Sequence, residues 1–269
     1  VIDNSTGANV RADINNVLLA ISSNNSGSSA PSTNYASQFF ANTSTSFMQL
    51  RNTANNAHIN LFSLAGAPAF PVDGTINSVN IGKGANSVAG NTVLGEGALD
   101  ASVSGENNTA IGKSSLTALT SGTRNTGTGV SSLAAVTTGT DNTAFGYNAL
   151  LVNTGSENTA VGSRSLDANT SGTRNTAVGD LTASLNTTGT DVTAVGWNAL
   201  KNSTGNSNTA VGSRSLDANT SGASNTAIGD LSLSGNTTAS NNTAVGTSAL
   251  QANTTGAFNI SVGAFALDA

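Results

Sequence analysis

The sequence contains no cysteine among its 269 residues and only one histidine, His58. Without cysteine, neither a disulfide framework nor a thiolate metal site can form. A Ser-His-Asp triad would have to use His58, and no nucleophile elbow accompanies that residue. The calcium-binding repeat pattern G-G-x-G-x-D is also absent. We therefore predict that the chain is not an enzyme and has no catalytic residue, cofactor or metal site.

Charge and large side chains are scarce as well. Charged residues make up 9% of the chain and aromatic residues 4%, and the net charge is −5. No basic run offers a phosphate-binding surface, so we expect no nucleic acid partner. No apolar stretch approaches 18 residues, so we expect no membrane insertion. The small residues that remain suit a thin coil with close backbone packing better than a thick globular core.

The first part of the chain differs in composition from the rest. Residues 1–64 are predicted to form an attachment or trimerisation module with a short amphipathic helix over residues 9–22. Strand-like pieces separated by polar turns predict a small β-meander, at residues 35–41, 47–52 and 57–64. Residues 65–76 hold two glycines and two prolines and are interpreted as a linker or collar.

From residue 77 onward the chain is periodic, and this period decides the fold prediction. A reference glycine recurs every 16 or 17 residues, preceded by a variant of N-T-A-V-G, at Gly95, Gly112, Gly129, Gly146, Gly162, Gly179, Gly196, Gly212, Gly229, Gly246 and Gly263. A leucine follows at the fourth position in nearly every repeat, at Leu99, Leu116, Leu133, Leu150, Leu166, Leu200, Leu216, Leu233, Leu250 and Leu267. A second glycine, such as Gly172, closes most repeats, and Ala239 is the exception.

This pattern predicts a mainly β protein, a repetitive parallel β-solenoid with about seventeen residues per coil. Alternation within N-T-A-V places Thr and Val on one side and Asn and Ala on the other. We expect the leucines to stack as a core ladder and glycines at both corners to supply unusual backbone angles. The recurrent Asn either forms an amide ladder or simply tolerates the turn. A helical solenoid is excluded because Thr, Asn, Gly and Ser are poor helix formers.

Residues 77–269 are therefore predicted to be a shaft, with a 14-residue coil at 77–90 and an incomplete last coil. About eleven coils at roughly 4.8 Å each give a rod of about 50 Å. A coil of small residues is slender for a monomer, so we expect a homotrimer that covers the exposed sides. The chain starts with Val1 and stops without a cap, so we expect it to be processed or part of a longer protein.

A second period overlies the first. Residues 142–191 and 192–241 match at an offset of 50, and N-T-A-V-G-S-R-S-L-D-A-N-T-S-G occurs identically at 158–172 and 208–222. This duplication of three coils indicates that shaft length is adjustable, which is typical of spacers and fibres.

Two segments resemble known families. N-S-V-N-I-G-K-G-A-N-S-V-A-G at 77–90 is similar to the head repeat of trimeric autotransporter adhesins, a trimeric β-roll. The N-terminal segment, including V-I-D-N-S-T-G-A-N-V and Y-A-S-Q-F-F-A-N-T-S-T-S-F-M-Q-L, resembles a module of tail-fibre proteins of marine cyanophages. This resemblance implies a homotrimeric virion fibre, with other tail proteins and a host surface glycan or lipopolysaccharide as partners. The alternative is a trimeric adhesin head on a bacterial cell surface.

The residue after each reference glycine varies most, which predicts an outward position. Tyr147 and Trp197 occupy it 50 residues apart. Aromatic faces stack on sugars, so both are candidate glycan contacts; alternatively, they pack against a neighbouring chain or shield a corner. The recurrent Thr suggests an ice-binding face as a remote alternative, disfavoured because we expect its Val companion to be core-like.

Overall fold

The computed structural model divides into two compact units, residues 1–72 and 73–269. In the first unit it describes the backbone of four short strands. In the second it describes Gly74–Ile76 and then residues 78–268. The expected helix over residues 9–22 lies outside the described residues.

The four strands of the first unit form one sheet in the order β1-β2-β3-β4. They are β1 (Ser26–Gly27), β2 (Phe39–Asn42), β3 (Phe47–Arg51) and β4 (His58–Ser63). Strands β2, β3 and β4 pair antiparallel, with a register irregularity between Met48 and Gln49, whereas β1 joins β2 in parallel. The three predicted strand-like pieces are therefore the β-meander.

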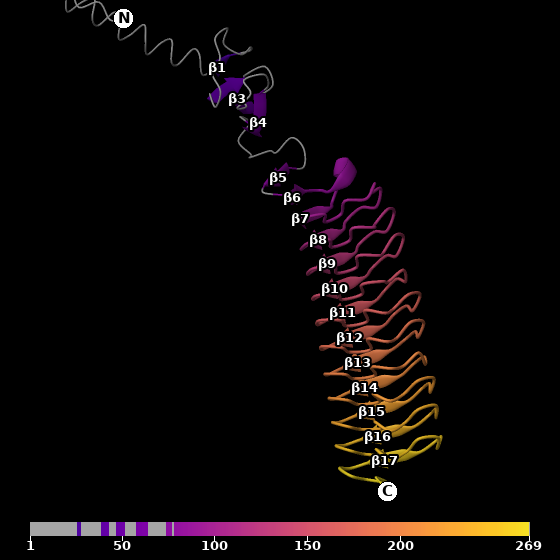
Figure 1. Ribbon diagram of the computed structural model, residues 1–269. Coiled ribbons are helices and arrows are strands. Elements are labelled where there is room, and N and C mark those ends of the chain that lie inside the picture. Colours follow the sequence, from indigo (N-terminus) through magenta and orange to yellow (C-terminus); the bar gives the residue numbers. More distant parts are fainter. Residues whose placement is uncertain are drawn as a thin grey trace, which may run out of the picture. The chain divides into compact units, whose positions relative to one another are not determined.

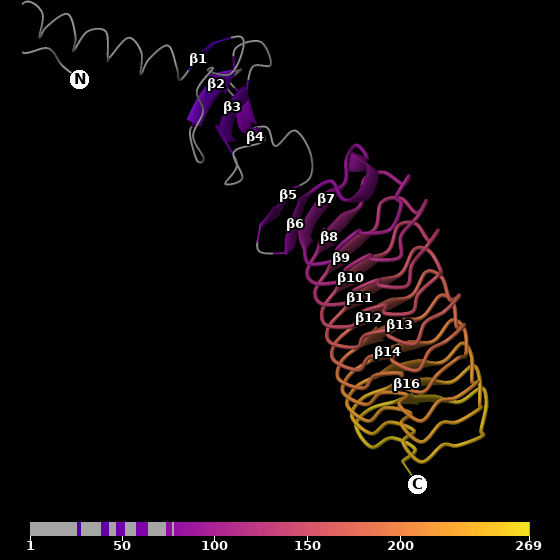
Figure 2. The ribbon, with the colours of Figure 1, turned by 45° about the horizontal axis from the view of Figure 1, so that its top comes forward.

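The second unit is the predicted parallel β-solenoid, in which successive strands lie side by side as one 13-stranded sheet (Figures 1 and 2). Its strands are β5 (Gly74–Ile76), β6 (Val79–Gly82), β7 (Thr92–Gly95), β8 (Thr109–Ile111), β9 (Thr126–Thr128), β10 (Thr143–Phe145), β11 (Thr159–Val161), β12 (Thr176–Val178), β13 (Thr193–Val195), β14 (Thr209–Val211), β15 (Thr226–Ile228), β16 (Thr243–Val245) and β17 (Ile260–Val262). From β7 to β17 the pairing is parallel and in exact register, so Thr143 lies opposite Thr159 and Ala144 opposite Ala160.

The beginning of the solenoid differs from the expected 14-residue coil. Strands β5 and β6 form an antiparallel hairpin, and β6 pairs antiparallel with β7. A 3₁₀ turn, η1 (Ala85–Ser87), follows, and the Ala85 N–H donates to the carbonyl of Leu99 at 3.1 Å. Segment 79–90 thus pairs with and packs on the first parallel coil rather than forming another one.

The interior of each coil is filled by a leucine and an alanine. The ladder leucines from Leu99 to Leu233 are all completely buried, and Leu250 is 4% exposed. Leu267 is 63% exposed because no described coil stacks on it. In the repeat that lacks the leucine, Ala183 occupies the ladder position and is also buried.

The ladder leucines adopt an unusual backbone conformation, with φ between 47° and 53°. This left-handed region costs a bulky L-residue roughly 1–2 kcal/mol. The conformation turns the side chain inward while the Leu116 N–H donates to the carbonyl of Ser132 in the next coil at 3.0 Å. Burial of the side chain and the coil-to-coil hydrogen bond offset the backbone cost.

The two glycines of a repeat have different roles. Reference glycines from Gly112 onward have φ between 118° and 144°, as Gly146 does at 144°, whereas Gly95 does not. The second glycines lack such angles, so the prediction that both corners need unusual angles is wrong for them. A Cβ on Gly172 would instead collide with the carbonyl oxygen of Gly189 in the next coil. Close coil-to-coil packing is what requires glycine there.

The strand-opening asparagines form a buried ladder, which decides between the two interpretations of that position. Oδ1 of Asn125 accepts the backbone N–H of Asn142 at 3.1 Å and its Nδ2 at 3.0 Å. Nδ2 of Asn142 also donates to the Gly155 carbonyl at 2.9 Å. The ladder is interrupted at Val192, which offers no oxygen to the N–H of Asn208.

Candidate binding surface

The described residues hold no group of three or more His, Cys, Asp or Glu side chains that could bind a metal ion. His58 lies in β4 of the first unit, and its side chain is outside the described part of the structure. None of the described helices is long and apolar enough to cross a membrane. The described residues with functional potential therefore lie on the outer surface of the solenoid.

One outer surface is the exposed side of the sheet, which we call the T-x-V face. It consists of two parallel rows of side chains, one from the first and one from the third residue of each strand. The threonine row comprises Thr92, Thr109, Thr126, Thr143, Thr159, Thr176, Thr193, Thr209, Thr226 and Thr243. The aliphatic row comprises Leu94, Ile111, Phe145, Val161, Val178, Val195, Val211, Ile228 and Val245, and Thr128 interrupts it. Strict alternation produces it, because the residue between the two rows is buried in every one of these strands.

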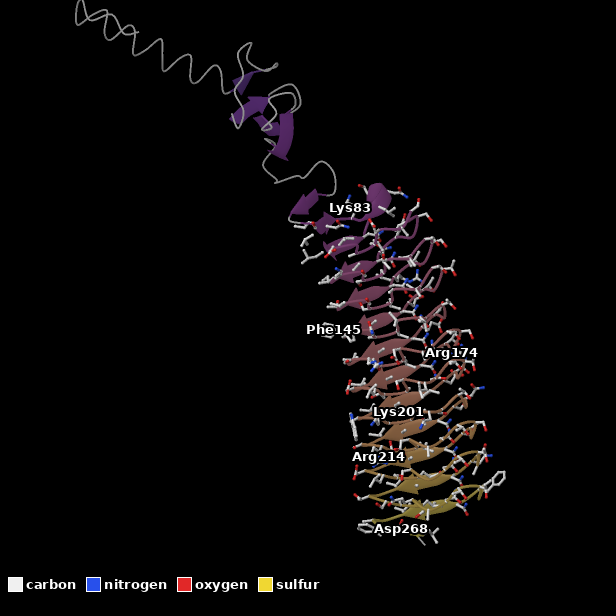
Figure 3. All side chains as sticks on the ribbon, in the orientation of Figure 1. Lys83, Phe145, Arg174, Lys201, Arg214 and Asp268 are labelled. Atoms are coloured by element: carbon white, nitrogen blue, oxygen red, sulfur yellow. The ribbon has the colours of Figure 1, made fainter. Side chains whose placement is uncertain are left out.

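The aliphatic row is not core-like, contrary to the expectation used against an ice-binding face. Leu94 is 46% exposed, Ile228 40% and Phe145 57%. Phe145 points away from the coil (Figure 3). Side-chain hydrogen bonds of the described residues do not use the hydroxyls of the threonine row. The face is thus apolar, with threonine hydroxyls that have no partner within the described chain.

Tyr147 and Trp197 lie at the same corner of coils three apart, and they are 55% and 51% exposed. Equivalent corner residues of successive coils lie next to one another along the solenoid, so Trp197 lies between Asp180 and Ser213. The Arg214 N–H donates to the Trp197 carbonyl at 2.9 Å, which fixes the backbone at this corner. Both aromatic rings are therefore accessible, and only Trp197 has a carboxylate in the adjacent coil.

Next to Trp197 lies a buried amide oxygen without a partner among the described residues. Asn198 is 9% exposed, and its Oδ1 makes no hydrogen bond among the described residues. Asn169 Oδ1 is unpartnered in the same way, although its Nδ2 donates to Asn153 Oδ1 at 2.6 Å. Asn198 Oδ1 is fully covered. The Asn198 side chain would therefore have to rotate before this oxygen could accept a hydrogen bond from a ligand stacked on the Trp197 ring.

The corner that precedes the strands carries charges that pair between coils. Arg124 donates two hydrogen bonds to Asp141, at 2.6 and 2.7 Å, and Arg174 donates two to Asp191, at 2.7 and 3.0 Å. These hydrogen bonds, more than any other cause, hold the pKa of Asp141 and of Asp191 below the ordinary value. The pairs are exposed, so they contribute little stability but keep one border of the T-x-V face polar.

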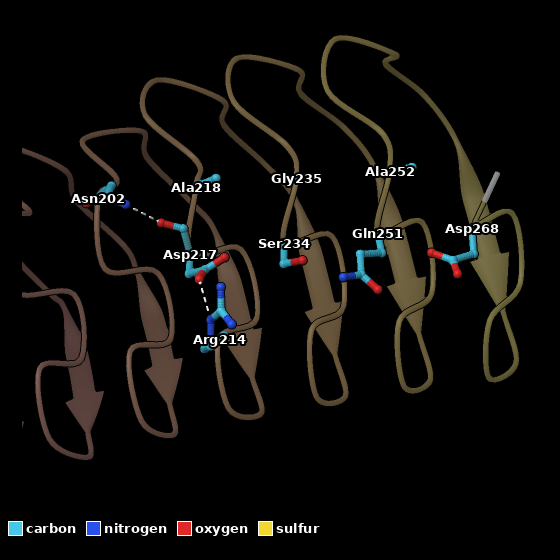
Figure 4. A pocket seen from close by; sticks show the side chains of 9 residues that line it. All are labelled: Asn202, Arg214, Asp217, Ala218, Ser234, Gly235, Gln251, Ala252 and Asp268. Carbon is cyan, nitrogen blue, oxygen red and sulfur yellow. Dashed lines mark hydrogen bonds and ion pairs between the residues drawn. The ribbon is translucent and has the colours of Figure 1, made fainter.

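A shallow groove of about 480 Å³ runs along another side of the last coils (Figure 4). Asp217 anchors it, since Arg214 Nε donates to its carboxylate at 2.9 Å and Asn202 Nδ2 to its carbonyl at 2.6 Å. Gly235 and Ala252 leave room at its floor. In the equivalent pair of the preceding block, Arg164 and Asp167, burial raises the pKa of Asp167. Polar side chains and small residues together line the groove, and none of its lining residues is aromatic.

Sequence reasoning located the accessible aromatic residues but missed the groove and the exposure of the aliphatic row. The alternation in N-T-A-V-G indicates the exposure of the aliphatic row, because it places Val on the same side of the strand as Thr. The chain matches no model of a protein family, and no curated protein or solved structure is significantly similar to it.

Proposed function

We propose that this protein is a non-enzymatic structural fibre of a phage tail, a rigid homotrimeric shaft that extends toward or adheres to the host cell surface. One observation carries the proposal: eleven parallel strands repeat in exact register, with inward positions almost fixed and the corner position after each reference glycine variable. A repeat of this kind supports length and stiffness without needing a particular site. The resemblance of residues 1–60 to tail-fibre modules supplies the virion location.

Other tail proteins are the partners proposed for the first unit, and a host surface glycan or lipopolysaccharide is the partner proposed for the shaft. Tyr147 and Trp197 are the candidate contacts, because exposed aromatic faces suit sugar rings. Binding of purified host lipopolysaccharide to the chain and to a Tyr147→Ala/Trp197→Ala double variant tests this partner. Equal binding by both proteins would remove these residues from the proposal.

The mass of the full chain in solution tests the shaft itself. Light scattering coupled to size exclusion should give about three times the chain mass of 26.4 kDa, and negative-stain images should show thin rods. A mass of one chain across the concentration range would refute the trimeric shaft. Immunogold labelling of virions would separate a tail location from a bacterial cell surface, which the adhesin alternative requires.

A further inference from the structure

We propose that the T-x-V face is the surface on which copies of this chain pack, with the faces of three copies turned toward a common axis. This inference rests on the proposed trimeric shaft and assigns its interface. The occupant of the face is a second and a third copy of the same chain.

The chemistry of the face fits a protein partner. Its centre is apolar, with Leu94, Ile111, Phe145 and Ile228 at least 36% exposed in one row. The corner before the strands carries the Arg124–Asp141 and Arg174–Asp191 pairs, so this border is polar. The corner after the strands is mixed, with charged residues of both signs beside the exposed Val130, Tyr147 and Trp197. Exposed apolar residues bordered by charged ones are the usual anatomy of a protein interface, and exposed apolar patches mark interaction sites.

The size of the face favours three copies over two. Ten strands spaced by about 4.8 Å give a length of about 48 Å, and three residues give a width of about 10 Å. Each copy thus offers on the order of 500 Å². Two copies would bury roughly 1,000 Å², below the usual range of a stable two-chain interface. Three copies would bury roughly 1,500 Å² in total, so a third copy adds buried area that a pair lacks.

The relief of the face argues against ordered water as its occupant. An ice-binding surface requires side chains of even height over a flat sheet. Here the aliphatic row contains Phe145, 57% exposed, next to Thr128 in the preceding strand and Val161 in the following one. Such uneven relief is readily filled by interdigitating side chains of another copy.

Single-cysteine variants test the assignment, because the chain has no cysteine of its own. Val195→Cys places a thiol in the aliphatic row, and Thr188→Cys places one in the same coil at an exposed position outside the sheet. Under mild oxidation, we expect Val195→Cys to give disulfide-linked chains as the major product and Thr188→Cys to give only background. Cross-linking at Thr188 but not at Val195 in a protein of three-chain mass would overturn the face and leave the trimeric shaft standing.

A charge on the face provides the second measurement. Val195→Asp should reduce the three-chain mass to one chain while the β-type circular dichroism persists, and Thr188→Asp should leave the mass unchanged. A Val195→Asp protein that remains a trimer would contradict the proposal. If the unmodified chain is itself monomeric, the shaft and the face both fail, and thermal hysteresis by that monomer would assign the face to ice.

Discussion

The two copies of the duplicated three-coil block, residues 142–191 and 192–241, show which positions the solenoid restricts. Several outward positions have changed, as in Tyr147 against Trp197 and Leu185 against Gly235. Most inward positions are identical, with Asn142 against Val192 and Ala183 against Leu233 as informative exceptions. Each exception lets one block serve as the natural control for the other.

The largest effect is expected in the core ladder. Leu233→Ala should destabilise the solenoid by about 2–5 kcal/mol, because it removes a completely buried leucine whose neighbours cannot fully close the gap. Ala183→Leu should stabilise the first block, since the coils on both sides already hold leucine in the same backbone conformation. The midpoint of guanidinium denaturation followed by circular dichroism measures both.

Leu185→Ala is the matched control for these variants, because Leu185 is two residues from Ala183 but 51% exposed. Its effect should stay within about 0.5 kcal/mol. A destabilising Ala183→Leu would show that the surrounding residues have already closed around the alanine.

The second-largest effect on the free energy of unfolding is expected at the glycines that close each repeat. At one of these positions the first block has Gly189 and the second block has Ala239. Gly172→Ala should cost about 1–3 kcal/mol, because its Cβ would press on the carbonyl of Gly189 and force the coils apart. Gly189→Ala should be milder, since the closest atom is the side-chain oxygen of Asn186 at 2.6 Å and Ala239 occupies the same position naturally. Equal losses in thermal unfolding would contradict this distinction.

Substitutions in the asparagine ladder should have an intermediate effect on the free energy of unfolding, with opposite signs in the two blocks. Asn142→Val should cost about 1–2 kcal/mol, because the Asn158 N–H loses its buried acceptor and the Gly155 carbonyl keeps only the hydrogen bond from Asn153 Nδ2. Val192→Asn should recover about 1 kcal/mol by supplying an acceptor to Asn208 and completing the ladder. Hydrogen exchange at Asn158 and Asn208 reports each change locally, and slower exchange at Asn208 in Val192→Asn is the expected result.

The period and the alternation were sufficient to predict the parallel solenoid, because sixteen- and seventeen-residue spacing with one leucine per repeat allows few other packings. The same alternation predicted that Thr143 and Ala144 face opposite sides. The antiparallel start was not predictable: residues 77–90 look like a repeat, but pairing direction is set by tertiary contacts of β6 with β7. Local sequence also gave no sign that the ladder leucines would adopt φ near 50°.

The candidate surface shows the same division between local and tertiary information. Exposure of Tyr147 and Trp197 followed from variability at their position, which needs no tertiary knowledge. The groove near Asp217 is lined by Ala218, Gly235 and Ala252, which occupy one repeat position in three successive coils. The small residues are visible in the sequence, but the hollow that they line exists only because the coils stack.

The smallest expected effect concerns the exposed ion pairs Arg124–Asp141 and Arg174–Asp191. The second of these has no equivalent in the second block, where Ser224 and Asn241 occupy the two positions. The lowered pKa of Asp141 and Asp191 means that their contribution is present above the ordinary aspartate pKa of about 3.9 and is lost as the pH falls through the lowered values. The Asp141→Asn/Asp191→Asn variant should therefore show a shallower fall in melting temperature below about pH 4 than the unmodified chain.

Asp167→Asn serves as the contrast, because burial raises the pKa of Asp167. Ionisation of this carboxylate therefore lowers the stability of the folded chain as the pH rises above the ordinary aspartate pKa. Its replacement should increase the melting temperature near neutral pH while leaving the acid limb unchanged, and identical profiles for the two variants would contradict the assignment.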